Sequence, residues 1–133
     1  MIKILTIPPP IYETLHKIFG VDWDKGLVIT YYPHIHTKGG KLSPDLEAHE
    51  STHLYQQQHH PKGVEGWWAQ YIEDPKFRLQ EETTAYIIQI EFIQKNLIGR
   101  TNRRAHFKHI LNSFVKMYGG IVTKEKAKQL LKI

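Results

Sequence analysis

Residues 43–53 read SPDLEAHESTH and decide how the rest of the chain is interpreted. The stretch opens with a serine N-cap, a proline suited to the first helical position and an acidic residue in the first turn, which together predict the start of a helix. Within that helix His49 and His53 are four residues apart, so both imidazoles lie on one face, as zinc ligands do in an H-E-x-x-H motif. The same face carries Leu46, Glu50 and Gln57.

The residue types in the motif indicate the chemistry that we expect. A catalytic zinc takes three protein ligands and keeps one position for a water molecule, whose pKa falls to about 7. Glu50 follows His49 directly, so it lies near the ligand face without being in line to bind the metal. We expect it to accept the proton of that water and pass it to the leaving amine. The alternative is a solvated helix with surface histidines and no metal.

Length and composition limit the classes of protein that the chain can belong to. Its 133 residues predict a single domain, residues 1–133, large enough to have a hydrophobic core of its own. There is no cysteine, which excludes disulfides, zinc sites with cysteine ligands and a cysteine nucleophile. The apolar run in residues 1–10 is too short for a signal-peptide core or a membrane span. We therefore expect a cytoplasmic protein with no membrane partner.

Charge is unevenly distributed along the chain. Residues 95–133 hold ten Lys and Arg against one acidic residue, for a net charge of +9, whereas residues 1–94 carry −4. Most segments with an excess of one charge are simply the solvent-exposed faces of helices. A basic segment can also bind nucleic acid or an acidic partner, so this half of the chain leaves nucleic acid open as a less favoured partner.

Hydrophobic periodicity predicts an α+β fold that is mostly helical with a small β-sheet. Residues 26–36 are β-branched and aromatic, as in a strand, and Pro33 places that strand at a sheet edge. Trp67 and Trp68 are expected in the core. The other predicted elements are a strand over 2–7 and helices over 10–19, 43–60, 66–73, 74–97, 102–118 and 123–131.

A catalytic zinc site needs a third ligand besides the two histidines. His59 lies six residues beyond His53, but six residues of helix turn by about 600°, which directs His59 away from the metal. The predicted helix 74–97 offers a second candidate, because it presents a stripe in which Ala85 would let two helices approach closely. That stripe consists of Arg78, Glu82, Ala85, Tyr86 and Gln89.

These motifs resemble the gluzincins, zinc peptidases in which a Glu from a downstream helix, followed three residues later by a small residue, completes the site. Glu82 and Ala85 match that pattern. The chain is more similar still to small phage and bacterial zincin-like metallopeptidases. The similarity covers roughly residues 27–131, through H-E-x-x-H-x-x-Q at 49–56, an aromatic segment at 67–71, R-x-x-x-E-x-x-A-Y at 78–86 and Tyr-Gly-Gly at 118–120.

The resemblance implies a zincin-like, single-domain zinc metallopeptidase that hydrolyses a peptide or peptide-like amide. His49, His53 and Glu82 would bind one zinc ion and Glu50 would activate the water. Glu81 and Glu82 are about 100° apart on their helix, so only one of them can face the histidines. Arg78 lies one helical turn before Glu82 and is expected to hold it. Ser51 and Thr52 depart from the family, which has bulky apolar residues there.

In zincins a strand before the motif helix binds the extended substrate along its free edge, which here implies a peptide or protein substrate along residues 27–36. Tyr86, His34 and His36 are the candidates for stabilising the oxyanion. The resemblance is also compatible with a phage-encoded protein of the virion or host cytosol. The chief alternative function is a non-enzymatic zincin-fold protein, of phage or prophage origin, with structural zinc and a basic partner-binding face.

Overall fold

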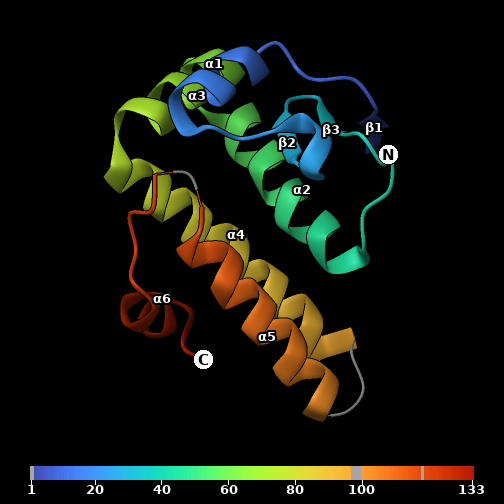
Figure 1. Cartoon of the computed structure of the whole chain (residues 1–133), viewed down its shortest axis with the longest axis vertical. Helices are drawn as coiled ribbons and strands as arrows, with labels where there is room; N and C mark the ends of the chain where they lie inside the picture. The colour runs from blue at the N-terminus through green and yellow to red at the C-terminus, as the bar shows by residue number, and fades with distance from the viewer. Residues whose placement is uncertain (1, 97–99, 118) are drawn as a thin grey trace.

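The computed structural model of the chain describes residues 2–96, 100–117 and 119–133. Helices dominate and a three-stranded sheet lies near the N-terminus, which confirms the α+β prediction (Figure 1). In chain order the elements are β1 (Lys3–Leu5), α1 (Tyr12–Phe19), η1 (Trp23–Lys25), β2 (Val28–Tyr31), β3 (His34–Thr37), α2 (Pro44–His59), α3 (Gly63–Glu73), α4 (Pro75–Asn96), α5 (Arg100–Val115) and α6 (Lys124–Leu131). Leu97 and Tyr118, the predicted ends of two helices, lie outside the described residues.

The sheet corrects one prediction, since residues 26–36 do not form a single strand. They form the hairpin β2–β3, in which Val28 pairs with Thr37 and Tyr31 with His34. Pro33 lies in the turn, where its fixed φ and missing N–H are tolerated. The strand order is β1-β3-β2, so β3 is central and only Val28–Tyr31 has the free edge that was expected for the whole segment.

Helix α2 begins where the sequence predicted. Ser43 has extended backbone angles (φ −64°, ψ 153°), Pro44 opens the first turn, and Asp45 and Glu47 follow it. The unusual Ser51 and Thr52 satisfy their hydroxyls inside the helix, by donating to the carbonyls four residues earlier at 2.6 and 2.9 Å. The hydroxyls of Ser51 and Thr52, which stand where the family has bulky apolar residues, are therefore both paired within α2.

Gln57 connects α2 to the hairpin by two hydrogen bonds. Its Nε2 donates to the Thr30 carbonyl at 2.8 Å, and its Oε1 accepts from the Tyr32 N–H at 2.7 Å. The side chain is fully buried, so both amide groups find partners away from water. This pair of hydrogen bonds fixes the motif helix relative to β2.

The described residues form two hydrophobic clusters on either side of the motif helix. One joins α1, the sheet and α3 around Trp67 and Trp68, which confirms that the Trp pair is core. The other lies between α4, α5 and α6. Helix α4, whose Ala85 is fully buried, packs along α2 and joins the two parts (Figure 1). Within the described ranges, the structure contains no helix with the length and apolar character of a membrane span.

Candidate metal centre

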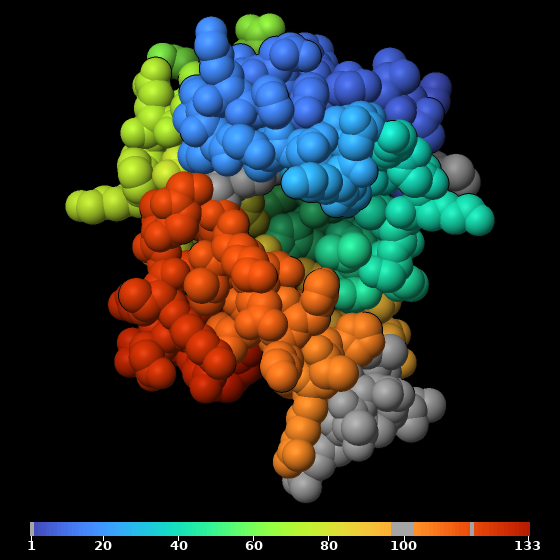
Figure 2. Space-filling model, in the orientation of Figure 1, coloured from blue at the N-terminus to red at the C-terminus, as the bar shows by residue number. Residues whose placement is uncertain are grey.

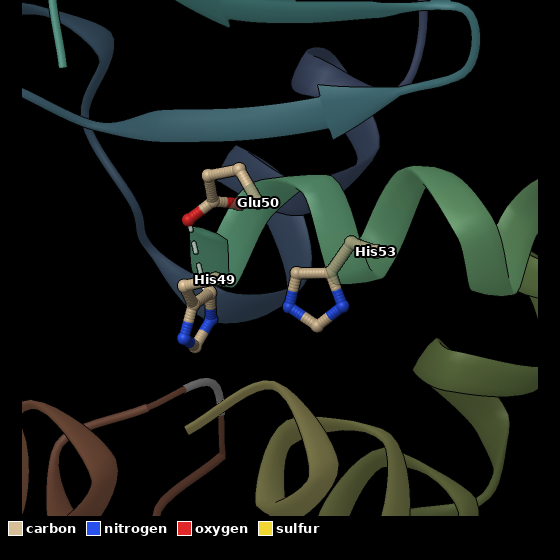
Figure 3. A group of neighbouring side chains, drawn as sticks. All are labelled: His49, Glu50 and His53. Carbon is tan, nitrogen blue, oxygen red and sulfur yellow. Dashed lines mark ion pairs between the residues drawn. The ribbon is translucent and has the colours of Figure 1, made fainter. Parts of the chain in front are cut away.

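His49, Glu50 and His53 are buried side by side on α2, with their ligand atoms within 4.8 Å of one another. The two imidazole rings meet edge to face with centroids 4.9 Å apart. Figure 3 shows that both rings extend from one side of α2, whereas the Glu50 carboxylate lies on the side toward the neighbouring strand. The i, i+4 spacing therefore brings both histidines together as the sequence predicted.

Glu82 reaches the same point from α4. Its Oε1 lies 3.2 Å from His49 Nε2 and 3.1 Å from His53 Nε2, and the residue as a whole is 8% exposed. Neighbouring corners of a tetrahedral zinc site with bonds of about 2.0–2.1 Å are roughly 3.3 Å apart. The structure therefore brings together the three residues expected to be ligands, at separations that suit one small metal ion.

Two glutamines determine which nitrogen of each imidazole is available. His49 Nδ1 donates to Gln89 Oε1 at 3.1 Å, and His53 Nδ1 donates to Gln56 Oε1 at 2.7 Å. An amide oxygen only accepts hydrogen bonds, so each Nδ1 carries the hydrogen and each Nε2 is directed at Glu82. Because these Nε2 atoms and the carboxylate are all electron-rich, they need a proton or a cation between them.

Both glutamines are themselves held in place by neighbouring elements. Gln89 Nε2 donates to Asp45 Oδ2 at 2.8 Å, and Gln56 Nε2 donates to the Glu81 carbonyl at 3.1 Å. These two roles were not predicted from the sequence. The available signal was spacing, since Gln56 lies three residues after His53, and Gln89 seven residues after Glu82 on the same stripe.

In the metal-free protein the required positive charge is a proton on an imidazole. Burial by itself lowers the pKa of His53, but the adjacent Glu82 carboxylate outweighs it and raises that pKa to about 9. Burial likewise raises the pKa of Glu82, but the two imidazoles hold it well below its usual range. The site therefore favours an imidazolium–carboxylate pair, which a divalent cation would have to replace.

Tyr71 and Trp67 of α3 separate the roles of the two adjacent glutamates. The Tyr71 hydroxyl donates to Glu82 Oε2 at 2.5 Å, which leaves Oε1 for the imidazoles. Glu81 instead accepts from Trp67 Nε1 at 2.9 Å. The structure thus places Glu82, and not Glu81, at the histidines, as the sequence analysis predicted.

Arg78 does not hold Glu82 directly, contrary to the prediction. Its Nη1 donates to the carbonyls of Tyr71 (2.6 Å) and Ile72 (3.2 Å), and the guanidinium lies over the Phe19 ring. The C-terminal carbonyls of α3 attract this cation, because they lack helical partners and carry partial negative charge. Arg78 acts on Glu82 only through the position of Tyr71.

Glu50 is set apart from the Nε2 atoms. Its Oε1 accepts from Thr30 Oγ1 of β2 at 2.9 Å, and its Oε2 lies 4.0 Å from His49 Nε2. By position, Glu50 could supply a ligand atom, since its carboxylate lies within 4.8 Å of a ligand atom of each histidine. Glu82 Oε1 is almost equidistant from both Nε2 atoms, whereas Glu50 Oε1 is hydrogen-bonded to Thr30 of the neighbouring strand.

A cavity of about 540 Å³ opens onto these groups. Its walls come mainly from β2 on one side and α5 on the other, with α2 and α4 between them. Figure 2 shows a hollow between the N-terminal part (blue) and α5 (orange), with α2 (green) visible inside it. The wall formed by α5 was not predicted from the sequence, although its polar lining residues His109, Ser113 and Lys116 follow helical spacing.

The structure distinguishes the three candidates for oxyanion stabilisation. Tyr86 lines the cavity, and its ring centroid is 4.4 Å from that of His49. His34 and His36 do not line it, because they alternate with Ile35, whose register partner Thr30 faces Glu50. His36 Nδ1 donates instead to the Ile7 carbonyl at 2.9 Å. The structure therefore excludes His34 and His36 as cavity residues.

His59 is equally remote from the site. Its ring stacks on Tyr55 with centroids 4.0 Å apart, and its Nδ1 donates to the Tyr55 carbonyl at 2.9 Å. Helix α2 continues to His59 without a turn, so the helical rotation directs this residue away from the other two histidines, as predicted from the sequence.

Comparisons of the chain with protein-family models, curated proteins and solved structures found no match.

Proposed function

We propose that this chain is a zincin-like zinc metallopeptidase in which His49, His53 and Glu82 hold one zinc ion. The observation that carries the proposal is the position of Glu82 Oε1, which lies 3.1–3.2 Å from both Nε2 atoms. Two nitrogens and one carboxylate oxygen form the ligand set of several catalytic zinc sites, which leave one position open. The cavity reaches this donor set, as hydrolysis requires.

Glu50 acts as the base in this proposal. A zinc ion in the site would supply Lewis acidity, which lowers the pKa of a water molecule and polarises the amide carbonyl. The Thr30 hydroxyl holds Glu50 Oε1, so Oε2 is the oxygen nearer His49 and the one placed to accept the water proton. Glu50 then donates this proton to the leaving amine nitrogen, which regenerates its carboxylate.

The substrate would lie along the free edge of β2. The Thr30 carbonyl already accepts from Gln57 Nε2 and Trp68 Nε1, so it points away from β3 and is occupied. Val28 precedes Thr30 by two residues and directs its backbone groups the same way. Pairing of an extended peptide would therefore use Val28 and the residues before it, which line the cavity.

Replacement of Glu50 tests the proposed function most directly. The wild-type chain should bind one zinc and cleave peptides, whereas Glu50→Gln should keep its zinc and lose at least about 100-fold in turnover. Glu47→Gln is the control, because Glu47 is exposed on the same helix. Zinc is measured by mass spectrometry and turnover with a quenched fluorescent peptide library. Full turnover in Glu50→Gln would refute the assigned base.

A second candidate function rests on the charge of the C-terminal helices. Helix α6 exposes Lys124, Lys126 and Lys128 while it buries Ala127 and Leu131, so its basic face is open to an acidic partner. In this case the zinc would be structural. Stoichiometric zinc together with no cleavage across the library would favour a non-enzymatic partner-binding protein over the peptidase.

A further inference from the structure

Basic side chains occupy both walls of the cavity. Lys25 of η1 lies on the wall formed with β2; on the opposite wall His109 lies on α5 and Lys116 directly follows that helix. Glu50 and Glu82 are the only acidic residues among the described residues that line the cavity. Both glutamates are buried, each residue being 8% exposed, whereas Lys25 and Lys116 are exposed. The entrance is therefore basic and the acidic groups lie at its base.

The two lysines keep their charge unpaired within the described part of the chain. Asp24 is adjacent to Lys25, but its carboxylate forms its ion pair with Lys38 at 2.7 Å. No ion pair of Lys25 or Lys116 is found among the described residues. Glu82 is engaged by the two imidazoles and Tyr71, so it does not neutralise the entrance. An approaching substrate meets net positive charge.

The position of Lys25 relates this charge to the substrate path. Lys25 precedes Val28 by three residues, and Val28 is the residue whose backbone is proposed to pair with the substrate. A strand advances about 3.3 Å per residue, so a side chain two or three residues along the bound peptide is within reach of Lys25. Lys116 faces the same space from the opposite wall.

We propose that the cavity selects acidic peptides, with a carboxylate within about three residues of the cleaved amide. This inference rests on the proposed peptidase function and adds the substrate class. Unpaired ammonium ions on both walls attract a substrate carboxylate and so favour its binding, whereas they repel a substrate lysine in the same position. An exposed ion pair changes binding by up to about five-fold, so two lysines together should provide about ten-fold discrimination.

The test compares peptides that differ only in charge. Zinc-loaded wild-type protein is assayed on one fluorogenic peptide with Glu, Gln or Lys near the scissile bond, and we expect kcat/KM to fall about ten-fold from Glu to Gln and further to Lys. The double variant Lys25→Gln/Lys116→Gln should abolish this preference. Lys108→Gln is the matched control, because Lys108 lies on α5 beside His109 but outside the cavity lining. Equal kcat/KM for the Glu and Gln peptides would overturn the inference.

A binding measurement separates failure of this inference from failure of the proposed function. Zinc-loaded protein that cleaves none of the peptides contradicts the peptidase proposal, and the same labelled peptides are then compared by fluorescence anisotropy. Tighter binding of the Glu peptide that is lost in Lys25→Gln/Lys116→Gln but kept in Lys108→Gln supports an acidic-peptide site. Equal dissociation constants for all peptides reject it.

Discussion

At the scale of single residues, the clearest result is the separation of Glu81 from Glu82. The 100° between adjacent helical positions means that only one of the two can face the histidines, and the stripe with Ala85 together with the resemblance to the gluzincin pattern chose Glu82. The partners of Glu81 were not readable, because the Trp67–Glu81 hydrogen bond joins two helices whose relative position depends on the whole fold. The roles of Gln56 and Gln89 were missed for the same reason, since an amide can orient a ligand only after tertiary packing.

Alanine substitution at these two glutamates gives opposite expected phenotypes. Glu82→Ala removes a proposed zinc ligand and should abolish stoichiometric zinc binding at micromolar protein. Glu81→Ala should keep one zinc but lower the free energy of unfolding by about 1–3 kcal/mol, because the buried Trp67 N–H loses its acceptor. Zinc content after dialysis and urea denaturation of both variants decide the matter. Zinc lost from Glu81→Ala and retained in Glu82→Ala would reverse the assignment.

Protonation of His53 predicts how the stability of the metal-free protein depends on pH. The folded pKa of about 9 exceeds the ordinary value of 6.5, so the stabilisation is complete below pH 6.5 and is lost as the pH rises through 9. Glu82 acts at the acidic end, because its lowered pKa stabilises the fold above its ordinary value of 4.5. The melting temperature of the metal-free protein should therefore fall between pH 6.5 and 9.5. A melting temperature that does not change over this pH range would contradict the ion pair between His53 and Glu82.

The same proton should be released when zinc binds. At pH 7.5 the metal-free His53 is protonated, and the ion requires a neutral imidazole, so about one proton leaves per zinc. Calorimetric titration in buffers with different ionisation enthalpies measures this number. Zinc affinity should rise with pH up to about pH 9. The melting temperature of the zinc-loaded protein should not fall between pH 6.5 and 9.5 as that of the metal-free protein does. Zinc binding without proton release would show that His53 is neutral beforehand.

At the scale of elements, the sequence predicted the helices well and the sheet less well. Helix α2 was located by Ser43, Pro44 and the two histidines, which are local signals. The hairpin was read as one strand because residues on both sides of Pro33 have strand propensity, and β-propensity does not show where a chain reverses. The α5 wall of the cavity also escaped prediction, because long-range packing places a helix from residue 100 onward opposite β2.

The contact between β2 and α2 can be tested by removing one hydroxyl. Thr30→Val has a similar shape and keeps the β-branched side chain, but it cannot donate to Glu50 Oε1. We expect zinc content to be unchanged and kcat to fall about ten-fold, because the proposed base loses the group that orients it. Thr37→Val is the matched control, since Thr37 is buried on the neighbouring strand. An equal fall of kcat in both variants would instead indicate that the substitutions disturb the sheet in general.

At the scale of the whole molecule, the distribution of charge separates the two candidate functions. The basic excess of residues 95–133 extends to the cavity, where His109 and Lys116 line the wall opposite β2. Helix α6 has an amphipathic pattern, with its lysines exposed and Ala127 and Leu131 buried, as expected for a solvated helix packed on a core. The charge therefore needs no large partner to explain it.

Duplex DNA provides the test of this interpretation. If the basic residues only solvate the surface, binding should be weak at low salt and undetectable at ~0.15 M salt, because it depends on counterion release alone. The anisotropy of a labelled duplex is measured across salt concentrations with wild type and with Arg103→Gln/Arg104→Gln. These titrations give the affinity and the slope of its logarithm against the logarithm of the salt concentration. Both arginines lie on α5, outside the residues that line the cavity, so their removal should leave zinc content and peptide turnover unchanged. Tight binding that persists at ~0.2 M salt and loses slope in the variant would instead support the non-enzymatic, partner-binding function.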